Sequence, residues 1–474
     1  MLLSRAADHR PAFFALTARQ PALGPGGGTS WRPVNGEGVV DWRGLTTHAC
    51  APNNPGNVKI SSVRSFLLSS PLSEPVHLSY YGGDRTILKR DALLVRIQAD
   101  NGLIGYGPGQ ASEKAHDAIR TTIAPFLEGR TLADPDALRV RFFEALTALG
   151  PGGDADLRKI YCSVEIALYD LCGKAWGAPV SELIGGRVRD RIRLYGSAGM
   201  YMPPEGYAAE AAGIAGLGFP AYKMRPALGP EKDLETVRLM RESVGPNVDL
   251  MVDAHTWWRM GDRSYDYTTI EELAAQMAAY DIAWLEEPLP PDDHEAYRRL
   301  REKQSVTVAG GEHEQSEEGY RDLILSRSVD VVQMDVVCQG GYSTGRRIFS
   351  DIAREGLRFA FHSWGTDLEV IAAAHLGICW PETVVEWLEY PVYSTPALAT
   401  MYPFPLAAEI LAEPLLITRG ELAVSQSPGL GVQVNEDVID RYPWIPGPWS
   451  YFRLHSPPET WAVTADHSVK WAAG

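Results

Sequence analysis

The chain has 474 residues, of which 45% are hydrophobic and 22% are charged, and a formal net charge of −16 at pH 7. This length predicts two or three units rather than one typical domain, and no apolar run approaches the roughly 20 residues that cross a bilayer. The acidic balance and the lack of a basic stripe argue against nucleic acid as a partner, whereas an acidic small molecule could still bind beside a divalent cation.

The first 57 residues differ in composition from the rest of the chain. They are rich in Gly, Pro and Ser, with GPGGG at 24–28 and APNNPG at 51–56, and predict a segment 1–57 that does not pack. Arginine exceeds acidic residues in its first third, which leaves an organelle transit peptide as one alternative and a misassigned start codon as another. Five widely spaced cysteines without a CxxC pair predict free thiols in a reducing compartment, so we expect a cytoplasmic location.

The next predicted unit covers residues 58–188 and combines strands with helices. Two strand-like runs, VKISSVRSFLL and ALLVRIQADNGLIGYG, are followed by helical periodicity from about Glu113 to Leu149 and from Tyr161 to Trp176. The NG pair at 101–102 marks a tight hairpin turn. Between the two runs, PLSEPVHLSYYGGDR at 71–85 is expected to close over a neighbouring site, because loops beside a rigid scaffold commonly set specificity.

The segment 189–400 repeats a short apolar strand followed by an amphipathic stretch of roughly 10–15 residues. The strand candidates in chain order are RIRLYG, PAYKM, VDLMVD, IAWLEE, VTVAGG, VVQMD, LRFAFH and TVVEWLE. Eight such units predict an α/β fold in which this segment closes into a (β/α)8 TIM-type barrel rather than an open sheet. The segment 401–440, which contains LLITRGELAV, is expected to return to the first unit, and 441–474 to form an irregular tail.

Polar residues terminate nearly all of these apolar runs. In a barrel of this kind the active site lies at the carboxyl ends of the strands. The successive strand ends are 23 to 33 residues apart, about the length of one strand-helix unit, so their side chains are expected to face one mouth. The candidates are Lys223, Arg225, Asp253, His255, Glu286, Glu312, Asp335, His362 and Glu389.

Three of these candidates, Asp253, Glu286 and Glu312, are carboxylates on adjacent predicted strands. Their hard anionic oxygens suit octahedral Mg²⁺ with water or substrate completing the shell, and their mutual repulsion would be costly without a cation. We therefore expect one Mg²⁺ per subunit. The alternative is three unrelated, solvated acids.

Two other short motifs are candidates for zinc-binding or nucleotide-binding motifs and do not fit either pattern. HEQSE at 313–317 lacks the second histidine of a zinc-protease helix, and GYGPG at 105–109 lies in a hairpin and does not open a helix. Neither supports a zinc or nucleotide site.

The order and spacing of the strand-end motifs resemble the mandelate racemase branch of the enolase superfamily. The resemblance covers roughly residues 58 to 434 and includes YCSVEIALYDLCGKAWGAPVSELIGG at 161–186. It implies a modified (β/α)8 barrel with an N-terminal α+β capping domain that C-terminal residues complete. It also implies that the three carboxylates are the Mg²⁺ ligands, with Glu286, the first glutamate of the EEP motif, as the ligand rather than Glu287.

By the same resemblance, Asp335 and His362 form an Asp-His dyad at the ends of the sixth and seventh strands. A carboxylate that holds one imidazole nitrogen fixes the tautomer and raises the basicity of the other nitrogen, which is left as a general base. The alternative for His362 is a structural histidine. Glu389 matches the acid that hydrogen-bonds the substrate carboxylate in relatives, and Glu386 on the same strand is its rival.

Lys223 and Arg225 occupy the family's KxK position, where the second lysine can act as an opposing base in relatives. Arginine is a poor proton acceptor but a good bidentate clamp for a carboxylate or hydroxyl, so a racemase with two bases is disfavoured. His255 resembles the DxH arrangement of some acid-sugar dehydratases and is a candidate general acid. Alternatively, it packs beside the tryptophans that follow it, and the dyad histidine returns the proton.

The resemblance implies Mg²⁺-dependent removal of the proton α to a substrate carboxylate through a metal-stabilised enediolate. We expect an acid-sugar dehydratase that converts a 2,3-dihydroxy acid to a 2-keto-3-deoxy acid. The alternatives are a racemase, epimerase or cycloisomerase of the same superfamily, and a non-catalytic metal-binding paralogue. The expected partners are a small carboxylate, in particular a sugar acid, and, by resemblance, further copies of the chain in a homo-oligomer.

Overall fold

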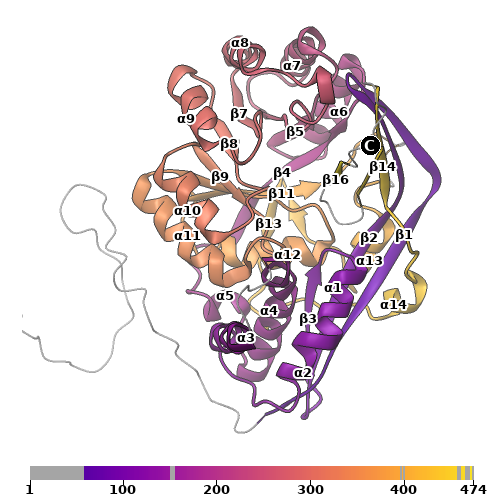
Figure 1. Ribbon diagram of the computed structural model, residues 1–474, viewed down its shortest axis with the longest axis vertical. Helices are drawn as coiled ribbons and strands as arrows, with labels where there is room; N and C mark the ends of the chain where they lie inside the picture. The colour runs from indigo at the N-terminus through magenta and orange to yellow at the C-terminus, as the bar shows by residue number, and fades with distance from the viewer. Residues whose placement is uncertain are drawn as a thin grey trace, which may run out of the picture. The chain divides into compact units, whose positions relative to one another are not determined.

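The computed structural model describes residues 58–149, 155–395, 398, 401–455, 461–464 and 470–471, so the predicted extension 1–57 lies outside the described residues. These residues build two sheets (Figure 1). One is a six-stranded antiparallel sheet in which a strand near the C-terminus, β14 (Ser450–Leu454), extends a hairpin near the N-terminus. The other is a ten-stranded sheet that contains a closed barrel. No helix within the described ranges is long and apolar enough to cross a membrane.

The capping unit begins with a long hairpin, β1 (Ile60–Tyr80) and β2 (Gly83–Ala99), and β3 (Ile104–Gly109) pairs with β2. Side chains alternate between buried and exposed along parts of β1, as expected for a sheet with one covered face. The predicted turn at 101–102 joins β2 to β3, with Gly102 at φ 88°. The helices of this unit are α1 (Glu113–Ala118), α2 (Ala124–Leu127), α3 (Pro135–Leu149), α4 (Ala155–Trp176) and α5 (Val180–Leu183).

The glycines of β3 let this strand lie directly against α4. A Cβ built at Gly107 would lie 2.0 Å from the carbonyl oxygen of Ser163, whereas one built at Gly216, at the end of helix α6 (Pro204–Gly216), meets nothing within 4 Å. We therefore expect Gly107→Ala to lower the free energy of unfolding by about 2–3 kcal/mol, because backbone on both sides cannot yield easily. Urea unfolding of both variants measures this, with Gly216→Ala as the matched control. Equal midpoints for the two variants would contradict the close approach.

The barrel consists of eight parallel strands, and β11 pairs with β4 to close it. The strands are β4 (Arg191–Met200), β5 (Ala221–Arg225), β6 (Asp249–Asp253), β7 (Ile282–Glu286), β8 (Val308–Gly310), β9 (Val331–Met334), β10 (Arg358–Phe361) and β11 (Val385–Pro391). The helices between them are α6 (Pro204–Gly216), α7 (Pro230–Val244), α8 (Tyr267–Met277), α9 (His294–Lys303), α10 (Glu317–Leu325), α11 (Gly341–Glu355) and α12 (Asp367–Gly377). The predicted α/β barrel with an N-terminal sheet domain is confirmed.

One buried side chain from each strand fills the barrel interior, with large and small residues mixed around the ring. The layer consists of Tyr195, Ala221, Met251, Trp284, Ala309, Val331, Ala360 and Trp387. The two tryptophans are the largest members of the layer, and the three alanines make room for them. The barrel is therefore a packed core, and ligands are confined to its mouth.

The C-terminal residues return to both sheets. After α13 (Pro405–Glu409), the hairpin of β12 (Ile417–Thr418) and β13 (Glu421–Ala423) pairs with β4 of the barrel, and α14 (Asp437–Arg441) follows. The expectation of an irregular tail over 441–474 needs correction: β14 (Ser450–Leu454) pairs antiparallel with β2, and β15 (Trp461–Thr464) and β16 (Lys470–Trp471) follow. The run SYFRL at 450–454 is a strand because the open edge of β2, more than 350 residues earlier, offers it partners.

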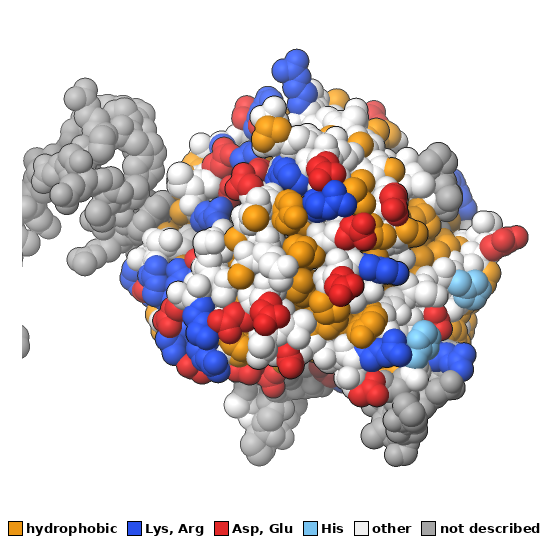
Figure 2. Space-filling model, turned by 90° about the horizontal axis from the view of Figure 1, so that it is seen from above, with side chains coloured by type: hydrophobic (Ala, Val, Ile, Leu, Met, Phe, Trp, Pro, Cys, Tyr) orange, Lys and Arg blue, Asp and Glu red, His pale blue; other side chains and the backbone are white. Residues whose placement is uncertain are grey.

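Surface charges are largely distributed in opposite-sign pairs. On the face shown in Figure 2, acidic and basic side chains are interspersed. Helix α9 provides an example, because Arg298 lies 2.6 Å from carboxylate oxygens of both Glu295 and Glu302. Such exposed pairs contribute little stability individually, so the energetically important charges are those that are buried.

A buried histidine joins the barrel, the capping unit and the C-terminal segment. His375 of α12 accepts a hydrogen bond from the Ser181 N–H through Nδ1 (3.3 Å) and donates from Nε2 to the Leu430 carbonyl (3.0 Å). Burial lowers the pKa of His375 to about 4, and Arg187 acts in the same direction. Only the neutral ring can accept a hydrogen bond at Nδ1 and donate one from Nε2. Protonation of Nδ1 would therefore remove the bond from Ser181.

This site predicts acid sensitivity. Between pH 6.5 and about 4, His375 is protonated in the unfolded chain but neutral in the folded protein. Its contribution to the free energy of unfolding is therefore complete above pH 6.5 and is lost as the pH falls to about 4. The total loss is about 3 kcal/mol of unfolding free energy. We expect His375→Gln, whose amide can keep both bonds, to remove this component when chemical denaturation is compared at pH 7, 5.5 and 4.5. Parallel pH curves for the two proteins would contradict it.

Candidate active site

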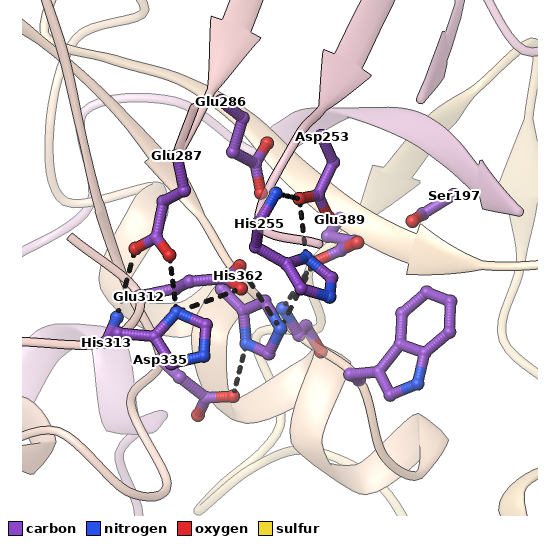
Figure 3. Close-up of polar contacts among 12 residues, drawn as sticks. Ser197, Asp253, His255, Glu286, Glu287, Glu312, His313, Asp335, His362 and Glu389 are labelled. Atoms are coloured by element: carbon purple, nitrogen blue, oxygen red, sulfur yellow. Dashed lines mark hydrogen bonds and ion pairs between the residues drawn. The ribbon is translucent and has the colours of Figure 1, made fainter. Parts of the chain in front are cut away.

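The predicted site residues converge at one mouth of the barrel, where the parallel strands end (Figure 3). They lie on, or within two residues after, strands β5 to β11: Lys223, Arg225, Asp253, His255, Glu286, Glu312, Asp335, His362 and Glu389. Each contacts at least one other member through a hydrogen bond or ion pair. The structure therefore brings together every residue that the strand-end pattern singled out.

Two buried cations lie among the carboxylates. Lys223 Nζ lies 2.6 Å from Glu286 Oε1 and 3.1 Å from Glu389 Oε1. Arg225 Nε lies 3.0 Å from Asp253 Oδ2, and its Nη2 lies 3.1 Å from Glu389 Oε1. Burial alone would lower the pKa of Lys223, but the surrounding carboxylates raise it well above its usual value. Both side chains are therefore held in the charged form.

Two buried carboxylate oxygens of the site accept no hydrogen bond from the residues that the structure describes. Glu312 Oε2 is buried and accepts no hydrogen bond in the described part of the chain, with His362 Nε2 3.6 Å away. Within the same described residues, Asp253 Oδ2 accepts no hydrogen bond either, although Arg225 Nε is close. Asp253, His255 and Glu312 offer ligand atoms within 4.8 Å of one another. Buried hard oxygens in this arrangement fit a divalent cation such as Mg²⁺.

Glu286 is the predicted ligand whose two oxygens are both engaged. Lys223 donates to Oε1 at 2.6 Å, and Trp284 Nε1 donates to Oε2 at 2.9 Å. Burial raises the pKa of Glu286 well above its usual value; Lys223 lowers it, and the nearby Asp253 and Glu312 raise it further. A divalent cation would relieve this repulsion. Glu286 fits a ligand role by position, with Lys223 competing for Oε1.

A second polar cluster, which the sequence analysis missed, consists of Glu287, His313 and Arg259. The Glu287 carboxylate accepts hydrogen bonds from Gly311 N–H (3.3 Å) and from His313 Nδ1 (2.5 Å), while Arg259 Nη2 donates to His313 Nε2 (2.7 Å). Burial and Arg259 lower the pKa of His313 well below its usual value, so the ring is neutral. The available signal was a histidine directly after Glu312 in the run GGEH, which is unrelated to zinc-protease spacing.

His255 contacts a predicted metal ligand. Its Nδ1 donates to Asp253 Oδ1 at 2.7 Å, and its ring centroid lies 6.1 Å from that of His313. Among the described residues, the ring contact found for His255 is with His313 and not with the tryptophans that follow it, and Trp258 Nε1 donates to a backbone carbonyl. His255 lines the cavity of the site, which leaves Nε2 available for a ligand.

Asp335 and His362 form a hydrogen-bonded pair just after β9 and β10. His362 Nδ1 donates to Asp335 Oδ2 at 2.9 Å, and Asp335 Oδ1 is fixed by the N–H of Val337 at 2.8 Å. Burial would lower the pKa of His362, but Glu312, Glu389 and the bond to Asp335 raise it to about 10. With that pKa the ring carries a proton on both nitrogens near neutral pH. A cation held by Glu312 would lower the pKa of His362 and free Nε2, on a side chain that lines the cavity, to act as a general base.

Glu389 is also fixed on both oxygens. Besides its ion pairs, its Oε2 accepts a hydrogen bond from the Ser363 N–H at 3.0 Å. Burial would raise the pKa of Glu389, but cationic neighbours, above all Lys223, lower it to about 2. Its rival Glu386 pairs instead with Arg358 at 2.9 Å and does not join the cluster.

A cavity of about 200 Å³ adjoins these groups. Its lining includes Arg225, His255, Glu312 and His362 from the barrel, and Arg85, Lys159, Trp449 and Phe452 from the capping sheet, α4 and the C-terminal tail. The segment 71–85, expected as a loop, forms the β1–β2 hairpin, and within it only Arg85 lines this cavity.

Comparison with known proteins agrees with this architecture. Residues 62–185 match the family described as mandelate racemase / muconate lactonizing enzyme, N-terminal domain, and residues 206–438 match the enolase C-terminal domain-like family. The 3,6-anhydro-D-galactonate cycloisomerase of Zobellia galactanivorans is a similar solved structure, with a TM-score of 0.68 and 27% identity over 81% of this chain and 99% of that one.

Curated relatives carry out more than one reaction. The D-galactarolactone cycloisomerase of Agrobacterium fabrum is 30% identical over 81% of this chain and 99% of its own length. The L-rhamnonate dehydratase of Saccharopolyspora erythraea is 31% identical over 74% of this chain and 85% of its own length. Both domain families match, and a curated relative that is 30% identical aligns with this chain over 99% of its own length. The chain therefore belongs to the mandelate racemase and muconate lactonizing enzyme family of the enolase superfamily.

Proposed function

We propose that this protein is a Mg²⁺-dependent dehydratase that converts a 2,3-dihydroxy sugar acid to a 2-keto-3-deoxy acid. The observation that carries the proposal is that His362, a candidate general base, lines the same cavity as Glu312, whose Oε2 accepts no hydrogen bond from the described residues, with an arginine in the position of a second base. Sugar-acid dehydratases and cycloisomerases among the relatives support a small carboxylate as the substrate.

Asp253 and Glu312, which offer ligand atoms within 4.8 Å of each other, would hold the cation together with Glu286, which ends the strand between theirs. Mg²⁺, when bound, supplies positive charge that stabilises the negative charge developing on the substrate carboxylate as the α-proton leaves. Arg225, which remains charged beside Asp253 and Glu389, is placed to orient the carboxylate or an adjacent hydroxyl. Glu389, which is ionised and engaged on both oxygens, holds Lys223 and Arg225 in position.

The chemical steps require one proton acceptor and one proton donor. His362 Nε2 takes the proton from C2, while Asp335 keeps the Nδ1 proton in place. The C3–oxygen bond then breaks, and the leaving hydroxide takes a proton from His362 or His255, so that one water is released. The enol that remains takes up a proton at C3 and releases the proton of its C2 hydroxyl, which gives the 2-keto-3-deoxy acid, so the net change is the loss of one water.

An isomerase is the second candidate, because the cycloisomerase relative matches the chain over 99% of its own length. A racemase would need an acceptor on the opposite face of C2. Lys223 is fully buried, bonded to Glu286, and does not line the cavity, which disfavours it in that role.

The test is to incubate the Mg²⁺-loaded protein with a panel of monoacid and diacid sugars and assay 2-keto-3-deoxy products with semicarbazide. We expect at least one acid to give product. If no keto product forms, exchange of the hydrogen at C2 in deuterium oxide, or closure or opening of a ring in the substrate, would instead establish an isomerase. Tight binding without any turnover would support the non-catalytic paralogue.

A further inference from the structure

Most of the cationic side chains that line the active-site cavity lack an anionic partner among the described residues. Arg85, Lys159 and Arg259 line it together with Arg225, yet among the residues that the structure describes, only Arg225 has a carboxylate within ion-pair distance. Lys159 Nζ donates to an amide oxygen and Arg259 to the neutral ring of His313. In a chain with a net charge of −16, unpaired cations gathered in one cavity point to an anionic ligand.

Arg85 of β2 is the most deeply buried of these unpaired cations, with 6% of its surface exposed. Its Nη1 contacts the sulfur of Met200 at 3.1 Å, and its guanidinium lies 4.8 Å and 4.5 Å from the ring centres of Trp449 and Phe452. Its Nε has no acceptor within the described ranges. Burial lowers the pKa of Arg85 to about 10, which reflects the cost of a buried charge that no carboxylate balances.

Arg85 lies within one side chain of the catalytic mouth. Met200, which it contacts, is at the end of β4 and is in register with Arg225 of β5. Arg225 in turn belongs to the cluster around the predicted metal ligands. An acid that fills the cavity from the metal ligands to the capping sheet would therefore bring its far end to the guanidinium of Arg85.

We propose that Arg85 binds a second carboxylate, at the end of the substrate away from the metal site, so that the substrate is a sugar diacid rather than a sugar monoacid. The inference rests on the proposed function, because it takes the first carboxylate to lie at the metal ligands. A guanidinium presents paired N–H donors that match a carboxylate, and flanking rings keep that fork in place. The rings of Trp449 and Phe452, which come from the tail, would also exclude water from this ion pair.

The chain offers a matched control in Arg90, on the same strand. Arg90 is also buried, contacts the sulfur of Met401, and lies 4.8 Å from the ring centre of Trp449. Unlike Arg85, it is not part of the cavity lining. A purely structural role for buried arginines on β2 would make the two positions equivalent, whereas a role in ligand binding would separate them.

The experiment measures binding without turnover, by calorimetry on the Mg²⁺-loaded protein carrying His362→Asn. Two probe pairs differ only at the far end of the sugar: galactarate against D-galactonate, and D-glucarate against D-gluconate. We expect one of the diacids to bind at least about 30-fold more tightly than its monoacid, a preference typical of a buried charged pair. Arg85→Met should reduce that preference to about 3-fold or less, Arg85→Lys should keep part of it, and Arg90→Met should keep all of it.

The outcomes separate this inference from the proposed function. Equal affinity for diacid and monoacid, binding of neither diacid, or a preference that survives Arg85→Met would overturn the inference, and the first two results need no variant at Arg85. The semicarbazide assay on the protein with His362 intact is read independently. Keto product from monoacids alone would support the dehydratase function and contradict the binding of a second carboxylate. A diacid preference that depends on Arg85, without any keto product, would support binding of the second carboxylate and contradict the dehydratase function.

Discussion

Replacing His362 with asparagine is expected to lower kcat by at least about 1000-fold, because the asparagine amide cannot accept the α-proton. The structure leaves His362 Nε2 facing the cavity, while Nδ1 is committed to Asp335. The magnesium affinity should change by only a few-fold, since the three carboxylates of the site are retained. Steady-state kinetics on the acid that gives product measure the loss, and calorimetry measures the affinity.

Two further variants show whether the loss is specific to the base. Asp335→Asn keeps the imidazole but weakens control of its tautomer, so we expect a smaller loss, of about 10- to 100-fold, with a displaced pH profile. His294→Asn removes a histidine that pairs with Glu314 and Asp322 and does not line the cavity, and should leave kcat unchanged. Full turnover by the His362 variant would show that another group removes the proton.

Replacing Glu312 with glutamine is expected to weaken Mg²⁺ binding by about 100-fold or more and to abolish turnover at ordinary metal concentrations. Glu312 Oε2 is buried without a hydrogen bond in the described part of the chain, and an amide offers the cation one neutral oxygen in place of a charged pair. Titration with Mn²⁺, followed by water proton relaxation, reports the metal affinity in the absence of any substrate. The result therefore does not depend on knowing the reaction.

The matched variant is Glu287→Gln, at the other glutamate of the EEP motif. The Glu287 carboxylate is committed to Gly311 and His313, so we expect the metal affinity to fall by no more than about 10-fold. The alternative ligand set of Glu287, Glu312 and His313 predicts equal losses for the two variants. A greater loss in the Glu287 variant would move the metal to that second cluster.

The barrel was predictable because its signal is local and repeated. Short apolar runs at regular spacing fix the strands, and parallel strands place their carboxyl ends together whatever the helices contain. Asp253, Glu312 and His362 could therefore be named without knowing any distance. The sequence could not show that Glu286 shares its Oε1 with Lys223, because rotamers and hydrogen bonds depend on neighbours from other strands.

The features that sequence reasoning missed depend on partners far apart in the chain. The run SYFRL becomes a strand only because β2 presents an open edge, and the prolines around it suggested irregular structure. Arg85 looked like the end of a loop, since nothing near it in the sequence indicates the rings of Trp449 and Phe452. His313 followed a predicted ligand but matched no known spacing.

The position of β14 in the chain has a consequence for biosynthesis. Barrel closure requires β11, which ends at Pro391, whereas Trp449 and Phe452 lie about 60 residues further along. At about 5–20 residues per second, the ribosome needs roughly 3 to 12 seconds to make that stretch. During this interval the acidic mouth can already exist with one wall missing, open to cations and to chaperones. If a protease cut the chain between β11 and β14, the active-site cavity would lose the wall formed by Trp449 and Phe452. The cleaved protein would then be expected to bind acids that do not fit the complete protein.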